Sequence, residues 1–438
     1  MARHESNGSN LEVRRDVKRL RSIIGAAKLL NSTFELDKLL TIILDLATHN
    51  LNAARGTIYL IDEEKKELWS RVLKGKTMVE IRLPIGTGIA GHVAKSGRIV
   101  NVEDASKDKR FYGAIDQKSG FQTKTMLCAP MKNRHGKIIG VFQIINKKSG
   151  TFGDEDRMFL VGFSEHAALA IENAKFHQAQ LEQERVEKEI QIAASIQQRL
   201  LPKTLPQLQE YEIAAATIPS RTVGGDWYAV VPLDDGRFVF TVADVSGKGI
   251  PAALLVSTLH ASFRAYLENR LPLDALVKRL NLLLFDNTTP ERFITFFVMA
   301  LDTASHTVEF VNAGHNPPYL YRRPSGFVEL AASGLPLGMM PDSEYKMETI
   351  AIEPDDVLVL YTDGVTEAMD RHEELYGEER LRQAVEQCAQ APASNLHASI
   401  LDDLRTFVGN EPQSDDITLL VARRTSGNPD TIKRKMGG

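Results

Sequence analysis

Hydrophobic and polar positions follow two different periods in the first part of the chain. Apolar residues recur at helical spacing over 11–31 and again from Ser32 to Leu51, where Ser32 followed by Glu35 indicates a capping box. A helical pattern returns at Asp154. Between these helices, strand-like alternation predicts strands at 57–61, 68–73, 126–131 and 138–146. This order predicts an α+β domain with an antiparallel sheet.

The helix predicted from 154 to about 201 is too long for one ordinary globular helix. Apolar residues keep a seven-residue step and resume it after a jump of five residues: Leu160, Ala167, Ala174, Leu181, then Val186, Ile190, Ala193 and Leu200. This spacing is typical of a coiled coil with a break in phase, and it predicts a homodimer. Two separate amphipathic helices with a solvated face are the alternative.

A second pattern of strands and helices follows the prolines at 202 and 206. Strands are predicted at 211–217, 227–232, 238–243, 294–302, 307–313, 318–322, 356–362 and 417–422, and helices at 251–268, 272–286, 378–389 and 393–407. This is a second α+β domain. The predicted organisation is an N-terminal helix at 1–34, a first domain at 35–175, a helical linker at 176–205, a second domain at 206–424 and a disordered tail at 425–438.

Composition narrows the class of protein. The 438 residues include 53 Lys and Arg and 57 Asp and Glu, a net charge of −4, which argues against a broad nucleic-acid-binding surface. The two cysteines, Cys128 and Cys388, are too far apart for a CxxC metal site or a disulfide framework, so reduced thiols are expected. The N-terminus has no apolar signal region, and the run 293–301 is about half the roughly 20 residues of a membrane span. We therefore expect a cytoplasmic protein.

Acidic residues at strand ends carry the candidate chemistry. Asp244 and Asp363 each follow a predicted strand, Asp415 and Asp416 precede one, and Asp226 follows two glycines. If the strands are antiparallel neighbours, their ends meet on one edge of a sheet. Carboxylates gathered there repel one another unless cations neutralise them.

Carboxylate oxygens suit Mg²⁺ or Mn²⁺ better than Zn²⁺. Two such ions about 4 Å apart can activate a water and neutralise a phosphoryl group during in-line attack. The residues therefore predict phosphoester hydrolysis without a covalent intermediate. Taken singly, each Asp is more simply explained as a turn residue, and only their number in one domain favours the metal site.

A series of strings makes a family resemblance specific. They occur in the order GGDWY, DVSGKGIPAALL, NAGHNPP, GLPLG, YTDGVTEA, LYGEERL and SDDIT, over about residues 190–423. They resemble the RsbU/SpoIIE-type branch of the PPM (protein phosphatase 2C-like) serine/threonine phosphatases. The resemblance implies an αββα sandwich of two antiparallel sheets.

The resemblance also implies residue roles. Asp244 would bridge two metal ions with help from the backbone carbonyl of Val245, and Asp363 would complete the second ion's shell. Asp415 would join that shell, and Asp226 would bind on the first ion's side, directly or through water. Asp244 and Asp363 are thus the expected catalytic residues. Asp416 ranks below Asp415, because its position is often Asn in the wider family.

The sequence does not assign the residue that protonates the leaving group or the residue that binds the phosphate. Ser246 stands where eukaryotic-type members have a proposed acid, His, so a water or His315 could serve instead. Arg221 or Lys248 could contact phosphate, although a surface role explains either one equally simply. Ala229 stands where the family usually has Asp, a change in the local pattern.

Members of this branch typically dephosphorylate a STAS-domain anti-sigma-factor antagonist, which then sequesters an anti-sigma kinase. The resemblance implies this partner. A catalytically silent scaffold is the rival function, but it predicts a lost ligand, and all four acids are present.

The first domain resembles a GAF sensor domain over about 35–175. The resemblance rests on three strings: LPIGTGIAGH from 83, MLCAPM from 126, and GVFQIINK from 140 followed by GTFGDED from 150. It implies a pocket beside the sheet for an unknown small-molecule or protein signal, and a regulatory role in which the signal acts through the helix 154–201.

Three sequence features of this domain could indicate a bound cofactor or nucleotide. Asn146, Lys147, Phe152 and Asp156 fit a cyclic-nucleotide signature, but Arg157 replaces its final Glu. Residues 86–91 match GxGxxG, yet the helix that follows is too short for a dinucleotide-binding crossover. His92 and Cys128 are explained more simply as turn or core residues than as haem anchors.

Overall fold

The computed structural model describes residues 35–74, 77–113, 116, 121–289 and 291–426. Contacts between residues divide the chain into two units, 1–185 and 186–438, and the division falls inside the predicted linker. The helix predicted at 11–31 and all but two residues of the predicted tail lie outside the described residues.

The N-terminal domain is built on one antiparallel sheet with the strand order β3-β2-β1-β6-β5-β4. Its strands are β1 (Ala53–Asp62), β2 (Glu67–Lys74), β3 (Thr77–Pro84), β4 (Val100–Val102), β5 (Met126–Lys132) and β6 (Ile138–Lys147). The four predicted strands are present. Strands β3 and β4 are additional. Strand β4 has only 3 residues, too few for an alternation to be visible, whereas β3 alternates from Val79 to Leu83 and could have been predicted.

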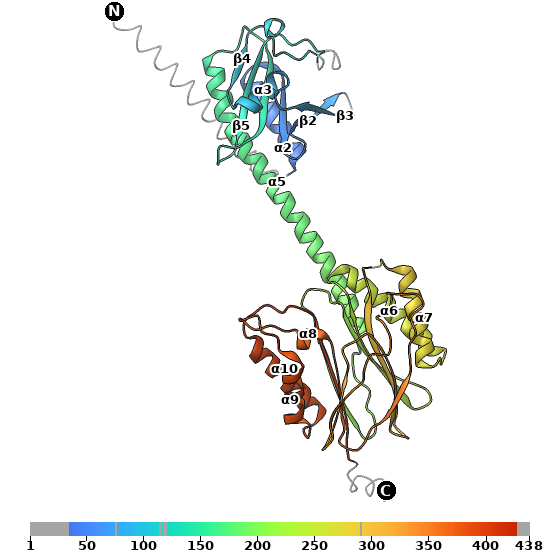
Figure 1. The fold of residues 1–438 in the computed structure, drawn as a ribbon. Coiled ribbons are helices and arrows are strands. Elements are labelled where there is room, and N and C mark those ends of the chain that lie inside the picture. Colours follow the sequence, from blue (N-terminus) through green and yellow to red (C-terminus); the bar gives the residue numbers. More distant parts are fainter. Residues whose placement is uncertain (1–34, 75–76, 114–115, 117–120, 290, 427–438) are drawn as a thin grey trace, which may run out of the picture. The chain divides into compact units, whose positions relative to one another are not determined.

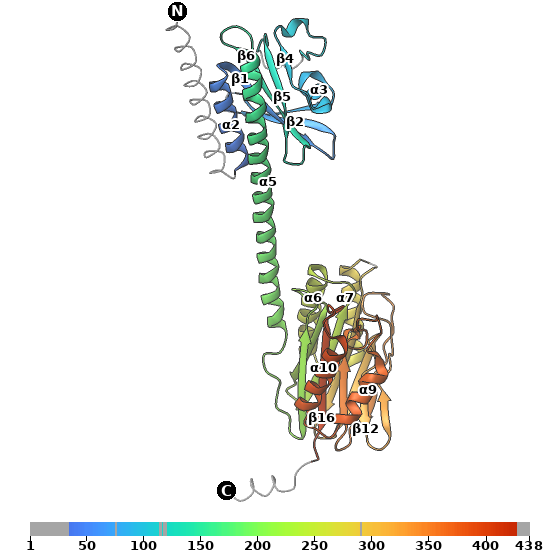
Figure 2. The same cartoon turned by 90° about the vertical axis from the view of Figure 1, so that its left-hand side faces the viewer.

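Helices cover both faces of this sheet. Helix α2 (Leu36–Asn50) and the first part of α5 (Asp154–Gln197) pack on one face, and α3 (Gly88–Ser96) packs on the other (Figure 2). Leu160, Ala167 and Ala174 of α5 are buried in the domain's own core. The first part of the seven-residue step therefore serves packing within one chain. Farther along α5 several large apolar residues are exposed, among them Phe176, at 73%.

The C-terminal domain contains two five-stranded antiparallel sheets. One has the order β14-β11-β10-β9-β8 and the other β13-β12-β15-β16-β7. The strands are β7 (Tyr211–Ile218), β8 (Asp226–Pro232), β9 (Arg237–Val245), β10 (Ile294–Asp302), β11 (Thr307–Ala313), β12 (Tyr319–Arg322), β13 (Gly326–Glu329), β14 (Glu348–Ala351), β15 (Val357–Tyr361) and β16 (Ile417–Arg424). The eight predicted strands are present, and β13 and β14, of 4 residues each, are additional.

The two sheets face each other between two pairs of helices (Figure 1). Helices α6 (Ile250–Glu268) and α7 (Leu273–Asn287) pack on the first sheet, and α9 (Gly377–Cys388) and α10 (Ala393–Val408) pack on the second. Apolar residues of both sheets, such as Phe240 and Leu420, fill the space between them. The fold is the αββα sandwich that the resemblance implies. A further short helix, α8 (Asp363–Thr366), follows β15.

Candidate functional site

The acidic residues meet where the two sheets of the C-terminal domain end together. Asp226 opens β8 and is the direct cross-strand partner of Asp244 near the end of β9. In the other sheet, Asp363 follows β15 and Asp415 precedes β16. Strands β15 and β16 are neighbours in that sheet. The expected meeting at one edge therefore holds within each sheet, where β8 pairs with β9 and β15 pairs with β16, but the two pairs belong to different sheets. The acids come from two facing sheets, because β9 and β15 each pair with neighbours of their own sheet.

Asp226 is held by hydroxyl groups from the opposite sheet. Its Oδ2 atom accepts hydrogen bonds from Thr362 Oγ1 and Thr418 Oγ1, each at 2.7 Å. All three residues are buried. Burial and the nearby Asp244 raise the pKa of Asp226 well above its usual value, and the threonine hydroxyls only partly oppose this. The two threonines were not predicted, although each stands directly beside or near a predicted acid in YTDG and DDIT.

Asp244 and Asp363 sit in a field of negative charge. Burial, followed by the charges of Asp363 and Asp415, raises the pKa of Asp244 to about 7. Burial, followed by the charges of Glu367 and Asp415, raises the pKa of Asp363 to about 6. Such shifts mark carboxylates whose charge lacks compensation, and a bound cation would supply it.

The adjacent residues Asp415 and Asp416 have different surroundings. Asp415 Oδ2 lies 2.8 Å from the Lys248 ammonium, which also donates to the Ser414 carbonyl. Asp416 is buried and accepts from the backbone amide and hydroxyl of Ser220 at 2.6 and 2.9 Å, and from the Gly225 amide at 2.5 Å. Asp416 therefore fixes the loop before β8, which agrees with its lower rank as a metal ligand.

The donor set fits hard divalent cations in its chemistry. Four carboxylates gather at one place, and three of them have pKa values raised by burial and by their neighbours' charges. Gly225 leaves room for the Val245 carbonyl, since a Cβ there would lie only 3.0 Å from that oxygen. Even so, among the described residues no three or more His, Cys, Asp or Glu side chains are arranged so that they could hold a metal ion. The ion pair of Asp415 with Lys248 and the threonine bonds of Asp226 occupy oxygens that the predicted site would use.

His315 has the properties of a structural residue. It is buried, its Nδ1 lies 2.8 Å from Thr295 Oγ1, and its backbone amide donates to Asn312 Oδ1. Burial lowers its pKa to about 4, so the imidazole is neutral at ordinary pH and has no ionised proton to give a leaving group. A buried, neutral imidazole is a poor general acid, and this favours water, the other candidate that the sequence raises.

The end of α5 and the turn after it touch the loop that carries Asp226. Gln197 Nε2 donates to the Gly224 carbonyl at 2.7 Å, and the Gly224 amide donates to Gln197 Oε1 at 3.1 Å. Trp227 Nε1 donates to the Leu200 carbonyl at 3.3 Å. The sequence indicated a helix here but not these contacts, because a lone Gln on a helix carries no signal of its own.

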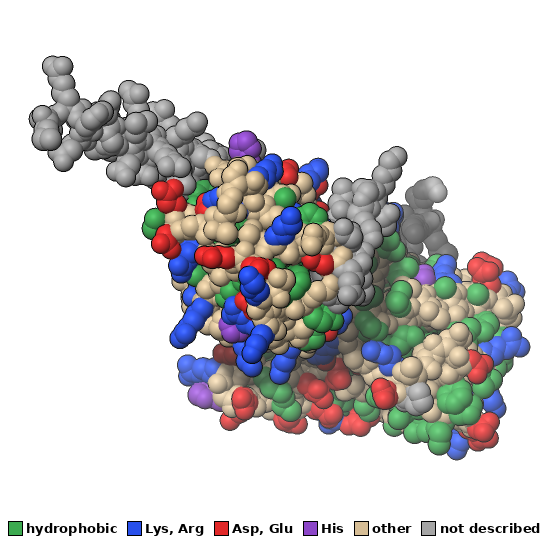
Figure 3. All heavy atoms as spheres, turned by 90° about the horizontal axis from the view of Figure 1, so that it is seen from above, with side chains coloured by type: hydrophobic (Ala, Val, Ile, Leu, Met, Phe, Trp, Pro, Cys, Tyr) green, Lys and Arg blue, Asp and Glu red, His purple; other side chains and the backbone are tan. Residues whose placement is uncertain are grey.

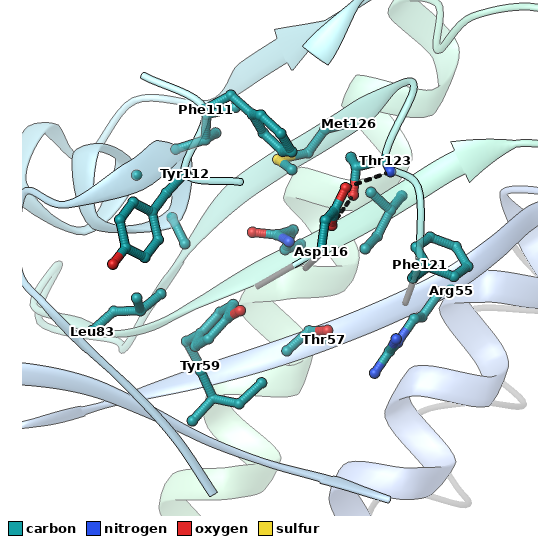
Figure 4. A pocket seen from close by; sticks show the side chains of 16 residues that line it. Arg55, Thr57, Tyr59, Leu83, Phe111, Tyr112, Asp116, Phe121, Thr123 and Met126 are labelled. Atoms are coloured by element: carbon teal, nitrogen blue, oxygen red, sulfur yellow. Dashed lines mark hydrogen bonds between the residues drawn. The ribbon is translucent and has the colours of Figure 1, made fainter. Parts of the chain in front are cut away.

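The N-terminal domain contains a pocket of about 610 Å³, including its open mouth. Its floor is formed by β1 and β6, and the side chains of Phe111, Tyr112, Phe121 and Thr123 also line it (Figure 4). Asp116 accepts from the Thr123 amide and hydroxyl at 2.7 and 2.8 Å. Thr57 and Gln143 line the pocket with only 5% and 8% of their surfaces exposed, and neither side chain has a hydrogen-bond partner among the described residues.

The cyclic-nucleotide signature residues lie apart from the lining of this pocket. Lys147 pairs with Asp156, and its ammonium lies 5.7 Å from the centre of the Phe152 ring. Asp156 also accepts from the Gly153 amide, and Asn146 bonds the backbone of residues 122, 124 and 125. These residues brace the turn between β6 and α5.

The remaining cofactor readings of this domain have structural explanations. Gly86 and Gly91 approach so closely that a Cβ on Gly91 would lie 2.9 Å from the Gly86 nitrogen. The following helix α3 joins strands of an antiparallel sheet, which excludes a parallel βαβ crossover there. Cys128 is a buried free thiol, and Cys388 is also free.

The surface carries charges of both signs, mixed over the face seen in Figure 3. Within the described chain, no helix combines the length and apolar character needed to cross a bilayer.

Comparison with protein families divides the chain as its motifs do. Residues 35–171 match the model of the GAF domain, and residues 234–425 match that of Stage II sporulation protein E (SpoIIE). The second match includes Asp244, Asp363 and Asp415 and begins after Asp226.

Individual relatives cover different parts of the chain. Phosphoserine phosphatase RsbU of Bacillus subtilis is 33% identical over 243 residues, which are 55% of this chain and 72% of RsbU. Dual 3',5'-cyclic-AMP and -GMP phosphodiesterase 11 of Drosophila melanogaster is 36% identical over 164 residues, 33% of this chain and 11% of that enzyme. The SiaA-PP2C domain of Pseudomonas aeruginosa aligns with a TM-score of 0.48 at 23% identity, covering 55% of this chain and 98% of that domain.

Proposed function

We propose, because this chain belongs to the family of RsbU-type serine/threonine phosphatases, that it hydrolyses phosphoserine or phosphothreonine on a partner protein under the control of its GAF domain. The observation that supports this is the convergence of Asp226, Asp244, Asp363 and Asp415 from two facing sheets. Burial, together with neighbouring charge, raises the pKa values of Asp244 and Asp363. Carboxylates crowded in this way support a cation-dependent site rather than a set of turns.

We propose two Mn²⁺ or Mg²⁺ ions as the cofactor. Asp244, the Val245 carbonyl, Asp363 and Asp415 would hold them together with Asp226. When bound, such ions supply an activated water and neutralise phosphoryl charge. Lys248 would then have to leave Asp415, because its ammonium occupies that carboxylate in this structure.

The reaction balances as simple hydrolysis. Water attacks phosphorus, the bond to the seryl or threonyl oxygen breaks, and that oxygen takes a proton, which gives a free hydroxyl group and inorganic phosphate. Asp226 stays fixed by Thr362 and Thr418, so its free oxygen keeps one orientation toward the site. Asp416 holds the loop of Ser220 and Gly225 in place beside it.

The test is phosphate release from p-nitrophenyl phosphate and from a phosphoserine peptide by the full chain, with and without Mn²⁺. Asp244→Asn and Asp363→Asn should each abolish turnover, while the exposed control Asp234→Asn should not change it. Turnover that persists in both site variants would refute the proposal. A chain that binds partners without any turnover would instead favour the scaffold.

The proposed substrate is a phosphorylated STAS-domain anti-sigma-factor antagonist in a partner-switching pathway. The 33% identity with RsbU over 72% of its length supports this class of substrate. A purified antagonist phosphorylated on serine should lose its phosphate with a KM below that of a phosphoserine peptide. Equal KM values would count against a dedicated protein partner.

Control by the GAF domain is proposed to act through α5. Gln197 at the end of this helix makes two hydrogen bonds to Gly224, two residues before Asp226. A displacement of the helix would therefore be felt at a predicted metal ligand. Inserting one residue near Leu181 turns the helix that follows by about 100°. It should alter regulation yet leave a fragment of residues 190–438 as active as before.

The signal itself is proposed to be a small molecule in the GAF pocket. Thr57 and Gln143 support this, because both are buried, have no hydrogen-bond partner within the described part of the chain, and would be stabilised by a polar ligand. Cyclic AMP and cyclic GMP are the first probes, because the GAF region resembles that of cyclic-nucleotide phosphodiesterases. Calorimetric titration of the full chain should detect binding that Gln143→Leu removes. Binding that survives this change would place the ligand elsewhere.

We also propose a cytoplasmic homodimer. Leu181, Val186, Ile192 and Ile196 are exposed on α5 beyond the GAF core, and a second copy would cover them. Light scattering of the full chain and of Leu181→Glu distinguishes a dimer from a monomer.

A further inference from the structure

Three cationic side chains stand near the acidic cluster, and they are bound in different ways. Lys248 is committed to Asp415 and the Ser414 carbonyl. Arg221 is exposed, in the loop held by Asp416. Arg292 is half-buried beside the loop that follows Asp244, and no sequence motif singled it out.

The backbone explains why Arg292 lies there. The pairing of β9 with β10 joins Asp244 to Thr295 and Val245 to Ile294, and it continues one step into the loop. The Ser246 amide donates to the Phe293 carbonyl at 2.9 Å, and the Phe293 amide donates to Ser246 Oγ at 2.9 Å. This pairing sets the residue before Phe293 against the loop 246–249.

The guanidinium of Arg292 lies against the backbone of Ser246 and Gly247. Its Nη1 is 3.4 Å from the Ser246 carbonyl, and a Cβ on Gly247 would lie 3.1 Å from the same nitrogen. Gly247 has a φ of +89°, which also favours glycine. The loop thus leaves room for an arginine beside the residues that follow Asp244.

Arg292 has no carboxylate partner among the described residues, although acids gather nearby. Its one long hydrogen bond leaves most of its N–H donors available, and an arginine presents these in a fork that matches phosphate oxygens. A guanidinium already held against the backbone also loses less freedom on binding than an exposed one.

We infer that Arg292 binds the non-bridging oxygens of the phosphoryl group and so fixes the substrate beside Asp244. This rests on the proposed phosphatase function and assigns its phosphate ligand. In this structure Lys248 is paired with Asp415, whereas Arg292 is held against the backbone with most of its N–H donors available for substrate and product phosphate. The exposed Arg221 is the rival ligand.

The experiment compares Arg292→Ala, Arg292→Lys and Arg221→Ala in the full chain with Mn²⁺ present. Binding of inorganic phosphate is measured by calorimetric titration, and KM and kcat are measured with p-nitrophenyl phosphate. Arg292→Ala should weaken phosphate binding and raise KM roughly tenfold or more, as expected for loss of a charged hydrogen bond. Arg292→Lys should recover part of the affinity, and Arg221→Ala should match the wild type.

Phosphate binding separates this inference from the function on which it rests. If the wild type binds phosphate through Arg292 but turns over no ester, the inference stands and the proposed function fails. Unchanged phosphate affinity in Arg292→Ala, loss of affinity in Arg221→Ala instead, or a wild type that binds no phosphate would each overturn the inference. Equal thermal unfolding temperatures of the variants exclude a folding defect as the cause.

Discussion

The GAF and phosphatase domains both bury charged side chains, but they compensate the charge differently. In the GAF domain the buried Asp156 is paired with Lys147 and also accepts from a backbone amide. In the phosphatase domain, Asp226, Asp244 and Asp363 gather near one another, and their pKa values are raised. A buried charge that is paired within the protein needs no ligand to compensate it and is explained as part of the fold. Crowded charges of one sign cost stability, and this cost points to a cation.

The largest expected difference is in activity. Asp244→Asn removes a predicted bridging ligand and should lower Mn²⁺-dependent turnover at least about a hundredfold. The same change removes a crowded charge. Without cations, the free energy of unfolding of the variant should therefore be about 1–4 kcal/mol greater than that of the wild type at pH 8. Denaturant unfolding in EDTA measures this. A destabilised variant would mean that Asp244 is compensated within the protein itself.

Breaking the pair in the GAF domain should have the opposite effect on stability. Lys147→Met leaves Asp156 buried without its partner and should destabilise the domain by about 3 kcal/mol. Turnover of p-nitrophenyl phosphate should remain, because the pair lies outside the catalytic domain. Urea unfolding followed in the GAF domain checks the first effect. Recovery of stability in the double variant with Asp156→Asn would confirm that the charge is responsible.

The pH dependence of stability sharpens the same contrast. The folded pKa of Asp244, about 7, lies above its ordinary value of 3.8, so the folded protein keeps a proton that the unfolded chain releases. Without cations, this contribution makes stability fall as pH rises from about 4 to about 7. His315, with its pKa lowered to about 4, acts in the other direction. As pH falls below 6.5, the unfolded chain binds a proton at this residue and the folded protein does not, so stability falls.

The difference between wild type and Asp244→Asn removes the contribution of His315, which is the same in both, and leaves that of Asp244 together with its effect on the neighbouring Asp226. This difference should grow between pH 5 and pH 8 in EDTA and shrink when Mn²⁺ is added. A difference that does not change with pH would show that Asp244 titrates normally in the folded protein.

The smallest expected effect lies in the GAF pocket. Thr57→Val replaces an unpartnered hydroxyl with a methyl group of similar size and should change stability by less than about 1 kcal/mol. Its consequence should appear only when a ligand is present, as a smaller rise of the unfolding temperature than in the wild type. A large loss of stability without ligand would mean that the hydroxyl has a structural partner.

Much of the fold could be predicted because strands with buried faces alternate or run apolar, as β10 and β16 do. The short β4, β13 and β14 carry too few residues for a period to be visible. The seven-residue step in α5 was read as a coiled coil, yet Leu160, Ala167 and Ala174 pack on their own sheet. A helix on a sheet and a helix on a second helix both need one apolar face, so spacing alone does not separate them.

The site could be predicted only in part. Glycines and strand ends marked Asp226, Asp244 and Asp363, but nothing in the sequence indicated that they come from two sheets. Asp415 and Asp416 are identical and adjacent, and only the hydrogen bonds from Ser220 and Gly225 separate a loop anchor from a candidate ligand. Arg292 carries no local signal at all, because its position depends on the pairing of β9 with β10.

The bonds from Thr362 and Thr418 to Asp226 also bear on how the sandwich opens. The Thr418 amide donates to Thr362 Oγ1 at 2.9 Å, so this amide is protected by the same contacts that join the two sheets. Its hydrogen exchange with solvent should be slowed both by the pairing of β15 with β16 and by the contacts of the two threonines with Asp226 of the other sheet. The slowest-exchanging amides of the domain should therefore include one next to the candidate active site, which makes the chemistry part of the most cooperative unit of the fold.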